Sequence, residues 1–326
     1  MTREELVYEL ESRLLKICPS VVTYPTQVRY KGKEKTSDWS RQFCIPESET
    51  TCEFIKKVFG VTCNDWEYKY VQAVSGAGKE ESKINTLHSS SLLALLCFSN
   101  ISRSHCLKIS GKVYNSVRFE VKNHVFDNSS NIDVVLHNDE TGDLLFLESK
   151  FTEYLSHDNS AFAKKYFNFY AEILPMIEGM PLQMVYPRKY KGGDGMGLKP
   201  KSERSLYSHL YMDGIKQCFS HIIGICQGPE ENEAFRWGKN SIGSIRFGSI
   251  LYKIPGDAFN SYKDFYSRTI GKIASNMLCK AFDNLKEIDN NFADRIEILP
   301  DILTYQNLVK ENPTWLDERV KTFYGL

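Results

Sequence analysis

The chain has 326 residues, of which 42% are hydrophobic and 25% are charged, and its formal net charge is zero. This length and composition can bury a full core, which excludes a disulfide-stapled miniprotein, a fibrous repeat and a disordered tail. No apolar run approaches the ~20 residues that a membrane-spanning helix needs, and the 9 cysteines occur without Cys-x-x-Cys spacing. We therefore expect a cytoplasmic protein without a membrane segment, in which only local basic patches contact polyanions.

Hydrophobic periodicity and turn residues predict alternating helices and strands. In chain order, we expect helices over 4–17 and 49–59, a serine-capped helix over 92–96, strands over 116–126, 131–137 and 144–151, helices over 160–180 and 207–224, a strand over 244–254 and a helix over 259–285. The glycine-rich segment 186–204 is expected to be a loop. This order favours an α/β fold with a mixed central sheet flanked by helices. Residues 1–70 are expected to form a small N-terminal accessory region, and 71–326 the main domain.

Three charged residues lie inside segments that otherwise have the composition of apolar strands. Asp133 belongs to the segment 131–137, and Glu148 and Lys150 belong to the segment 144–151. Charged residues are depleted in strands, and alternation along a strand makes Glu148 and Lys150 point the same way. Because both faces of the segment 144–151 also carry apolar residues, we expect a central strand with two buried charges. A solvent-exposed hairpin with a surface Glu–Lys pair is the alternative.

The two acids are expected to meet across the hairpin. Strands joined by a short turn are neighbours, which places Asp133 near Glu148, where their like charges repel. A hard divalent cation between the carboxylates removes this conflict, and oxygen ligands with open positions favour Mg²⁺, with Mn²⁺ able to substitute. Lys150 can then reach a water or a phosphate beside the metal. Two acids and a lysine around Mg²⁺ suit the hydrolysis of phosphodiester bonds.

The same residues resemble the signature of a known superfamily. Asp133, the hairpin that follows it and Glu148-Ser149-Lys150 resemble the D…E-x-K motif of the PD-(D/E)XK nucleases, with Ile132 in place of the usual preceding proline. The resemblance implies a restriction-endonuclease-like core. It also implies that Asp133 and Glu148 bind the metal and that Lys150 orients or activates the attacking water.

Further residues are candidates for a supporting role. The segments 76–80 and 88–91, together with Glu120, are similar to a bacterial restriction-endonuclease-like family. Many nucleases of the superfamily carry an extra glutamate in or before the first core helix, so either Glu80 or Glu120 could complete the metal shell. Gln217 lies on a predicted helix after the lysine strand, where some members place a glutamine. An exposed loop acid, a strand-edge charge and a packing amide are the respective alternatives.

Basic residues gather in the segment 186–204, and a second basic run covers residues 29–35. Mobile cationic loops suit contacts with phosphates, although most charge runs are simply solvated. Since the predicted site hydrolyses phosphodiesters, we expect the first segment to contact DNA. The residues expected to do so are Arg188, Lys189, Lys191, Lys199 and Lys201.

The residue pattern predicts a Mg²⁺-dependent phosphodiester hydrolase, and the resemblance implies a deoxyribonuclease, an endonuclease with a restriction or other defence role. A DNA repair or recombination nuclease is one alternative. Another is a non-catalytic nucleic-acid-binding subunit that retains the fold, which the intact Asp133, Glu148 and Lys150 argue against. A glycosidase built on the carboxylate pair is disfavoured by the adjacent lysine. A homodimer would suit the cutting of both DNA strands.

Overall fold

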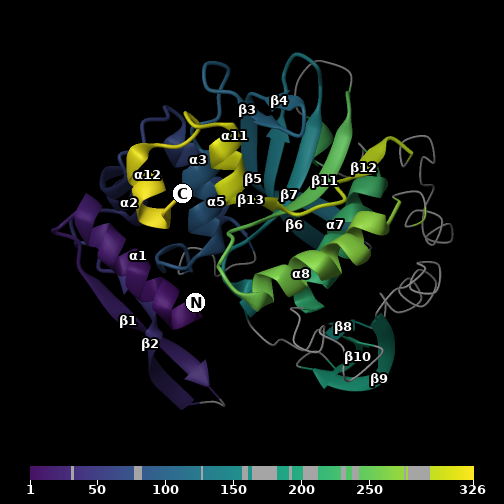
Figure 1. Cartoon of the computed structure of the whole chain (residues 1–326), viewed down its shortest axis with the longest axis horizontal. Coiled ribbons are helices and arrows are strands. Elements are labelled where there is room, and N and C mark those ends of the chain that lie inside the picture. The colour runs from purple at the N-terminus through teal and green to yellow at the C-terminus, as the bar shows by residue number, and fades with distance from the viewer. Residues whose placement is uncertain are drawn as a thin grey trace.

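A computed structural model shows a mixed β-sheet with helices packed on both of its faces (Figure 1). The structure describes residues 1–30, 33–76, 83–125, 128–155, 161–163, 182–190, 193–200, 212–228, 233–236, 242–274, 277 and 294–326. Across these residues, no helix is both long enough and apolar enough to cross a membrane.

The described residues form helices and strands that match the prediction in part. The α-helices are α1 (Arg3–Ile17), α2 (Thr51–Phe59), α3 (Trp66–Val74), α5 (Ser90–Phe98), α7 (Met212–Cys226), α8 (Asp257–Arg268), α11 (Tyr305–Glu311) and α12 (Glu318–Tyr324). The strands are β1 (Thr23–Tyr30), β2 (Lys33–Phe43), β3 (Leu107–Ile109), β4 (Lys112–Tyr114), β5 (Ser116–Val125), β6 (Asn128–His137), β7 (Leu144–Lys150), β8 (Ala161–Ala163), β9 (Leu182–Tyr190), β10 (Gly193–Pro200), β11 (Ile245–Leu251), β12 (Ile296–Ile298) and β13 (Leu303–Thr304).

The central sheet has the strand order β12–β11–β7–β6–β5, with β13 beside β11. β5, β6 and β7 form the predicted antiparallel meander, whereas β11 runs parallel to β7 and to β12. The predicted α/β class with a mixed central sheet is therefore confirmed. Every residue of β7 and β11 is buried, as expected for central strands that are covered on both faces.

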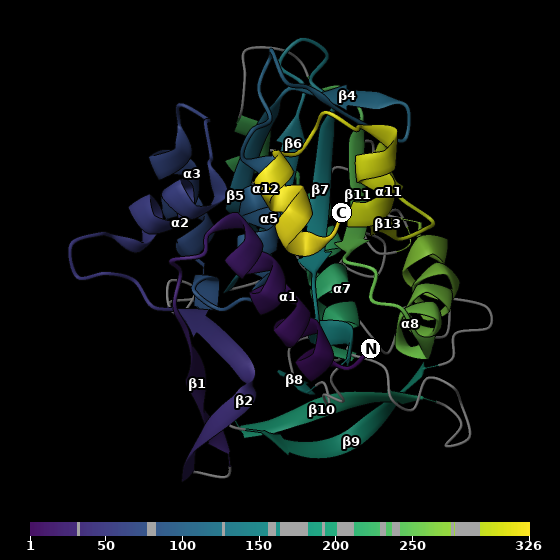
Figure 2. The ribbon, with the colours of Figure 1, turned by 60° about the vertical axis from the view of Figure 1, so that its left-hand side comes forward.

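Two consecutive residues of β7 show which helices cover which face of the sheet. Ser149 shares a hydrogen bond of 2.7 Å with the hydroxyl of Tyr305 on α11, whereas Glu148 accepts one of 2.7 Å from His221 on α7. Successive side chains of a strand point to opposite faces. The helices α11 and α7 therefore lie on opposite faces, and α8 lies beside α7 (Figures 1 and 2).

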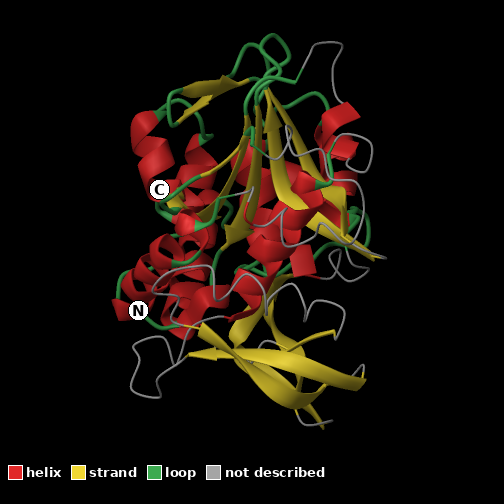
Figure 3. Cartoon of the chain, turned by 90° about the vertical axis from the view of Figure 1, so that its right-hand side faces the viewer, coloured by secondary structure: helices red, strands yellow, loops and turns green. Residues whose placement is uncertain are grey.

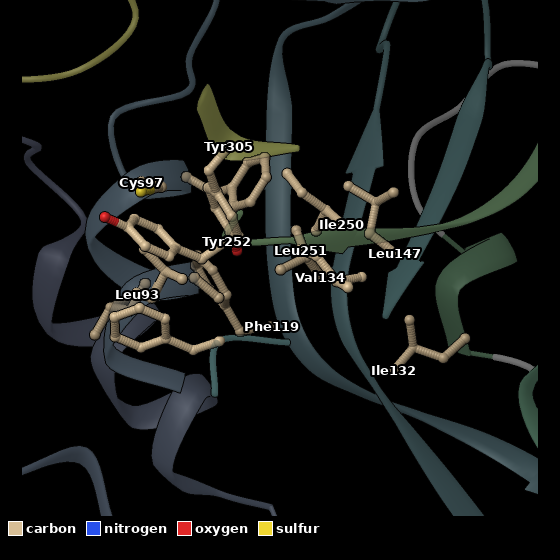
Figure 4. Packing of buried hydrophobic residues seen from close by; sticks show 14 of the residues in the cluster. Leu93, Cys97, Phe119, Ile132, Val134, Leu147, Ile250, Leu251, Tyr252 and Tyr305 are labelled. Carbon is tan, nitrogen blue, oxygen red and sulfur yellow. The ribbon is translucent and has the colours of Figure 1, made fainter. Parts of the chain in front are cut away.

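The helix α5 lies in the core on the same face as α11. All residues from Leu92 to Phe98 are buried, and a helix that is apolar on every side belongs inside a protein. Side chains of α5 gather with Val134 of β6 and Leu147 of β7 (Figure 4). The expected serine cap is Ser89, whose hydroxyl accepts a hydrogen bond of 3.1 Å from the Leu92 N–H.

The helix expected over 259–285 is shorter than predicted, because α8 ends at Arg268. Thr269 leaves the regular helical conformation, and its hydroxyl donates back to the Phe265 carbonyl at 2.7 Å. Gly271 then passes so close to Pro300 that a Cβ at this position would collide with the Pro300 backbone. The helix therefore ends close to the point where the chain contacts Pro300, a residue about 30 positions further along the sequence.

Two small antiparallel sheets, β1–β2 and β8–β10–β9, lie at one end of the molecule (Figures 2 and 3). The expectation of a loop over 186–204 was wrong, because most of this segment pairs in the β9–β10 hairpin. The pairing register shifts between Gly195 and Gly197, and glycines inside a strand commonly mark such irregularities. A helix was expected over 160–180, but residues 161–163 form the strand β8. The other residues of that segment lie outside the described residues.

The Asp143 carboxylate joins the turn between β6 and β7 to the start of β11. It accepts hydrogen bonds of 2.8 Å from the Ser244 N–H and 2.7 Å from the Thr141 hydroxyl, and Lys112 lies 3.3 Å away. At Gly243, a Cβ would collide with the Thr141 carbonyl oxygen. Burial alone would raise the pKa of Asp143, but hydrogen bonds from Ser244, Thr141 and Lys112 lower it to about 2.

Replacing Asp143 with alanine should lower the free energy of unfolding by about 2 kcal/mol at neutral pH, the scale of a shift of one to two pKa units. Because the folded pKa lies below the ordinary value of 3.8, this stabilisation is present above pH 3.8 and is lost as the pH falls toward 2. Urea unfolding of both proteins from neutral pH down to about pH 2.5 tests this. Equal acid sensitivity in the two proteins would contradict it.

Candidate functional site

Asp133 and Glu148 come together where β6 and β7 stop pairing. The β6–β7 ladder ends with Val134 opposite Leu147, and Asp133 and Glu148 are the residues that directly flank this last pair. Here the backbone ladder is replaced by a bond to a side chain, because the Ser149 N–H donates to the Asp133 carboxylate at 2.7 Å. The end of the ladder thus places the two acids in adjacent positions on neighbouring strands.

Glu148 is enclosed by the protein and has partners from two elements. Its exposed fraction is 1%, and that of Lys150, two residues further along β7, is 6%. Lys150 forms an ion pair with Glu148, and the other carboxylate oxygen accepts a hydrogen bond of 2.7 Å from His221 Nε2. A surface Glu–Lys pair is therefore excluded. A buried carboxylate is costly unless it is paired, and Glu148 is paired on both oxygens.

The two acids differ in how strongly they hold a proton. Burial and then the neighbouring Glu148 charge raise the pKa of Asp133 well above its usual range. Burial alone would raise the pKa of Glu148 too, but the Lys150 ammonium and His221 outweigh it and lower this pKa to about 2. Glu148 is thus an anion at neutral pH, whereas Asp133 resists ionisation. A further cation beside both carboxylates would favour their ionised forms.

His221 is a residue of the site that sequence reasoning missed. It lies on α7, four residues after Gln217, the residue expected to support the site from this helix. A lone histidine in an apolar stretch is more often structural, so only its contact with Glu148 distinguishes it. Gln217 is half-buried, and its Oε1 has no hydrogen-bond partner among the described residues.

The docking of α7 on the sheet fixes the position of His221. The buried Asn123 side chain on β5 donates to the His221 backbone carbonyl at 2.9 Å. Gly224, one turn later, allows this approach, because a Cβ there would collide with the Asn123 amide. The imidazole itself lies 2.8 Å from the Ser130 hydroxyl through Nδ1, and its centroid lies 6.3 Å from the Phe247 ring.

Glu120 lies on β5, opposite Asp133 in the β5–β6 register. Its φ of +47° lies in the left-handed region, which costs a residue other than glycine about 1–3 kcal/mol and is often found at functional sites. Glu120 and Asp133 line a small cavity together with the first turn of α5. The other acid expected to support the site, Glu80, lies outside the described residues.

The basic residues expected to contact DNA map to the hairpin at one end of the molecule. Arg188 and Lys189 lie on β9, and Lys199 lies on β10. Lys191 and Lys201 fall outside the described residues.

A mixed sheet with this strand order, flanked by helices and carrying two acids and a lysine on adjacent strands, defines a restriction-endonuclease-like α/β protein. A family model described as "restriction endonuclease associating with ARP" matches residues 24–191, and the chain belongs to this family. The match covers Asp133, Glu148 and Lys150, whereas α7 with His221 lies beyond it. No curated protein and no solved structure matches the chain.

Neutralising the two acids should change stability in opposite directions. At pH 7 without added metal, the unfolded chain has an ionised Asp133. The folded protein must either take up a proton on this carboxylate or bury its charge, and both cost free energy. Asp133→Asn removes this cost and should raise the free energy of unfolding by roughly 1.4 kcal/mol for each unit by which the folded pKa is raised. Glu148→Gln leaves the buried Lys150 ammonium without its carboxylate and should lower the free energy by about 3–5 kcal/mol.

Urea unfolding in the presence of EDTA measures both effects. The stability difference between Asp133→Asn and the wild type should grow as the pH rises above 3.8. The wild type loses stability over this range because its folded state holds the Asp133 proton more tightly than its unfolded state does. An Asp133→Asn protein that is less stable than the wild type throughout pH 4–8 would contradict the raised pKa.

Proposed function

We propose that the chain is a metal-dependent endonuclease that hydrolyses DNA phosphodiester bonds, with a restriction or other defence role. The observation that carries this proposal is the meeting of Asp133, Glu148 and Lys150 on two neighbouring strands, with Glu148 and Lys150 both buried. Membership in a restriction-endonuclease family supports the same chemistry. A buried lysine paired with an acid is expensive to maintain, which favours a chemical role.

The donor atoms suit Mg²⁺ or Mn²⁺. Asp133 and Glu148 would hold the ion, and Mg²⁺ typically uses one or two carboxylates and leaves its other positions to water and substrate phosphates. Among the described residues, no group of three or more histidine, cysteine, aspartate or glutamate side chains is placed to hold a metal. The raised pKa of Asp133, caused first by burial and then by Glu148, is the conflict that a cation relieves. When bound, the ion would polarise the phosphate and lower the pKa of a bound water.

The protein's own side chains then have separate tasks. Lys150 cannot ligate a metal because its ammonium has no lone pair. Its ion pair with Glu148 holds this positive charge beside the carboxylates, where it can stabilise negative charge that develops on the phosphate and orient the attacking water. Glu148 stays ionised because Lys150 and His221 oppose the effect of burial on its pKa.

One observation favours a non-catalytic role as the second candidate. Lys150 and His221 together engage both oxygens of Glu148, so the protein's own groups compensate its buried charge. A chain of this kind could retain the fold only to bind nucleic acid or a partner subunit. Cleavage assays on DNA with Mg²⁺ and with EDTA separate the two roles.

Lys150→Met should leave DNA binding near normal and reduce cleavage by at least ~100-fold, the scale of losing one preorganised electrostatic or proton-transfer group. Methionine keeps the length and the apolar stem, so the two carboxylates should stay in place. Single-turnover cleavage and a DNA-binding titration on the same protein measure the two effects.

Lys69→Met is the matched control for Lys150→Met. Lys69 is also a buried lysine, with an exposed fraction of 4%, and its ammonium contacts Asp65 at 3.0 Å and the Ser99 carbonyl at 2.6 Å. Both substitutions remove a buried lysine, but only one removes it beside the two acids. If Lys150→Met still cleaves DNA at the wild-type rate, the nuclease motif is a structural salt bridge.

The β9–β10 hairpin is the proposed DNA contact. Arg188 and Lys189 lie on a strand that projects at one end of the molecule rather than in the central sheet (Figure 3). Lysine and arginine side chains that neutralise phosphates add affinity without reading the base sequence. Such contacts would hold the duplex against the site without determining the cleavage sequence.

The triple variant Arg188→Glu, Lys189→Glu and Lys191→Glu should weaken DNA binding and flatten its salt dependence. The slope of log K against log salt should fall by about 0.9 for each phosphate contact that is lost. Fluorescence anisotropy with duplex DNA at several salt concentrations measures this slope. The control variant replaces three exposed lysines on other elements, Lys56, Lys57 and Lys310, with glutamate. If the salt-dependence slopes of the two variants are equal, the hairpin is not part of the DNA interface.

A further inference from the structure

His221 connects α7 directly to the site. Its exposed fraction is 1%, and both ring nitrogens have partners: Nε2 lies 2.7 Å from Glu148 Oε2, and Nδ1 lies 2.8 Å from the Ser130 hydroxyl. An ionised carboxylate only accepts hydrogen bonds, so Nε2 carries the proton that faces Glu148. In the neutral ring, Nδ1 then accepts from the Ser130 hydroxyl. The order of groups is hydroxyl, imidazole, carboxylate.

This arrangement restrains the Glu148 carboxylate on both sides. Lys150 contacts one oxygen from the same strand, and His221 contacts the other from the helix. Without His221, the Lys150 ammonium alone would orient the carboxylate. Each carboxylate oxygen has two lone pairs, so a hydrogen bond from His221 to Oε2 leaves acceptor positions for a metal ion.

The imidazole is itself held from several directions. The Asn123 side chain bonds the His221 backbone at 2.9 Å, and Ser130 bonds the ring at 2.8 Å. The close approach at Gly224 sets the position of the helix on β5. A ring fixed at its backbone and at both nitrogens is suited to holding another group in place.

We propose that His221 is a positioning residue for Glu148, and that through it α7 sets the affinity of the site for a divalent cation. This inference rests on the proposed function. Groups that hydrogen-bond a metal-binding carboxylate typically change metal affinity by 10–100-fold. Because α7 lies beyond the residues that the family model matches, the site is completed by a helix outside residues 24–191.

Mn²⁺ binding to the full chain, measured by electron paramagnetic resonance without DNA, tests the proposal. His221→Leu should weaken Mn²⁺ binding by about 10–100-fold. His221→Gln keeps an N–H donor in a comparable position and should restore the affinity to within a few-fold of the wild type. Ser130→Ala removes only the partner of Nδ1 and should give a smaller loss than His221→Leu.

Ile222→Val is the matched control for the structural contribution of α7. Ile222 is fully buried on the same helix, so its truncation loosens packing without removing a bond to Glu148. It should lower the free energy of unfolding and leave the Mn²⁺ affinity unchanged. If His221→Leu fails to fold, Ser130→Ala and His221→Gln still carry the comparison.

The outcomes separate the inference from the proposed function. Asp133→Ala, which removes a proposed ligand, is the reference for loss of the metal site. If Asp133→Ala loses Mn²⁺ while His221→Leu, or in its place Ser130→Ala, binds as tightly as the wild type, the inference is overturned and the metal site stands. If the wild type shows no saturable Mn²⁺ binding, the metal-dependent function fails and the inference fails with it.

Discussion

The arrangement of the site depends on one buried charge, the carboxylate of Glu148. Placing an ionised carboxylate inside a sheet costs several kcal/mol unless cations or donors compensate it. The compensating groups come from two elements, because Lys150 lies on the same strand and His221 on α7. The charge therefore requires β7 in the middle of the sheet and α7 docked on that face. Strand pairing places Lys150 beside Glu148, and helix packing places His221 beside it.

The two ends of the central hairpin have opposite characters. At the turn, Asp143 and Ser244 bind β7 and β11 together, and the strands pair regularly. At the other end, the Ser149 N–H bonds to the Asp133 side chain, and Glu120 adopts a left-handed conformation. Natural proteins retain such costly features where they serve function. The regular end therefore anchors the hairpin, and the irregular end carries the candidate site residues.

Local pattern was sufficient for much of the fold and for part of the candidate site. The alternation of apolar residues predicts β5, β6 and β7, and charged residues in apolar strands single out Asp133, Glu148 and Lys150. The pattern failed over 259–285 and 186–204. In the first segment, the helix ends beside a close contact with Pro300, and in the second, glycines pair within a strand. The first outcome depends on a residue far along the chain, whereas the second is a local hairpin in which glycine-rich sequence pairs as strands.

The sequence by itself determined the periodic elements, the antiparallel meander and the placement of two acids and a lysine on adjacent strands, because each depends on residues close together in the chain. The tertiary structure alone decided that His221, 73 residues from Glu148, would bond to it. It also decided that β11 would pair in parallel with β7. Both contacts join segments that are far apart in the chain, a helix and a strand in one case and two strands in the other. The packing energy that favours them is spread over many residues, so no local stretch of sequence reveals it.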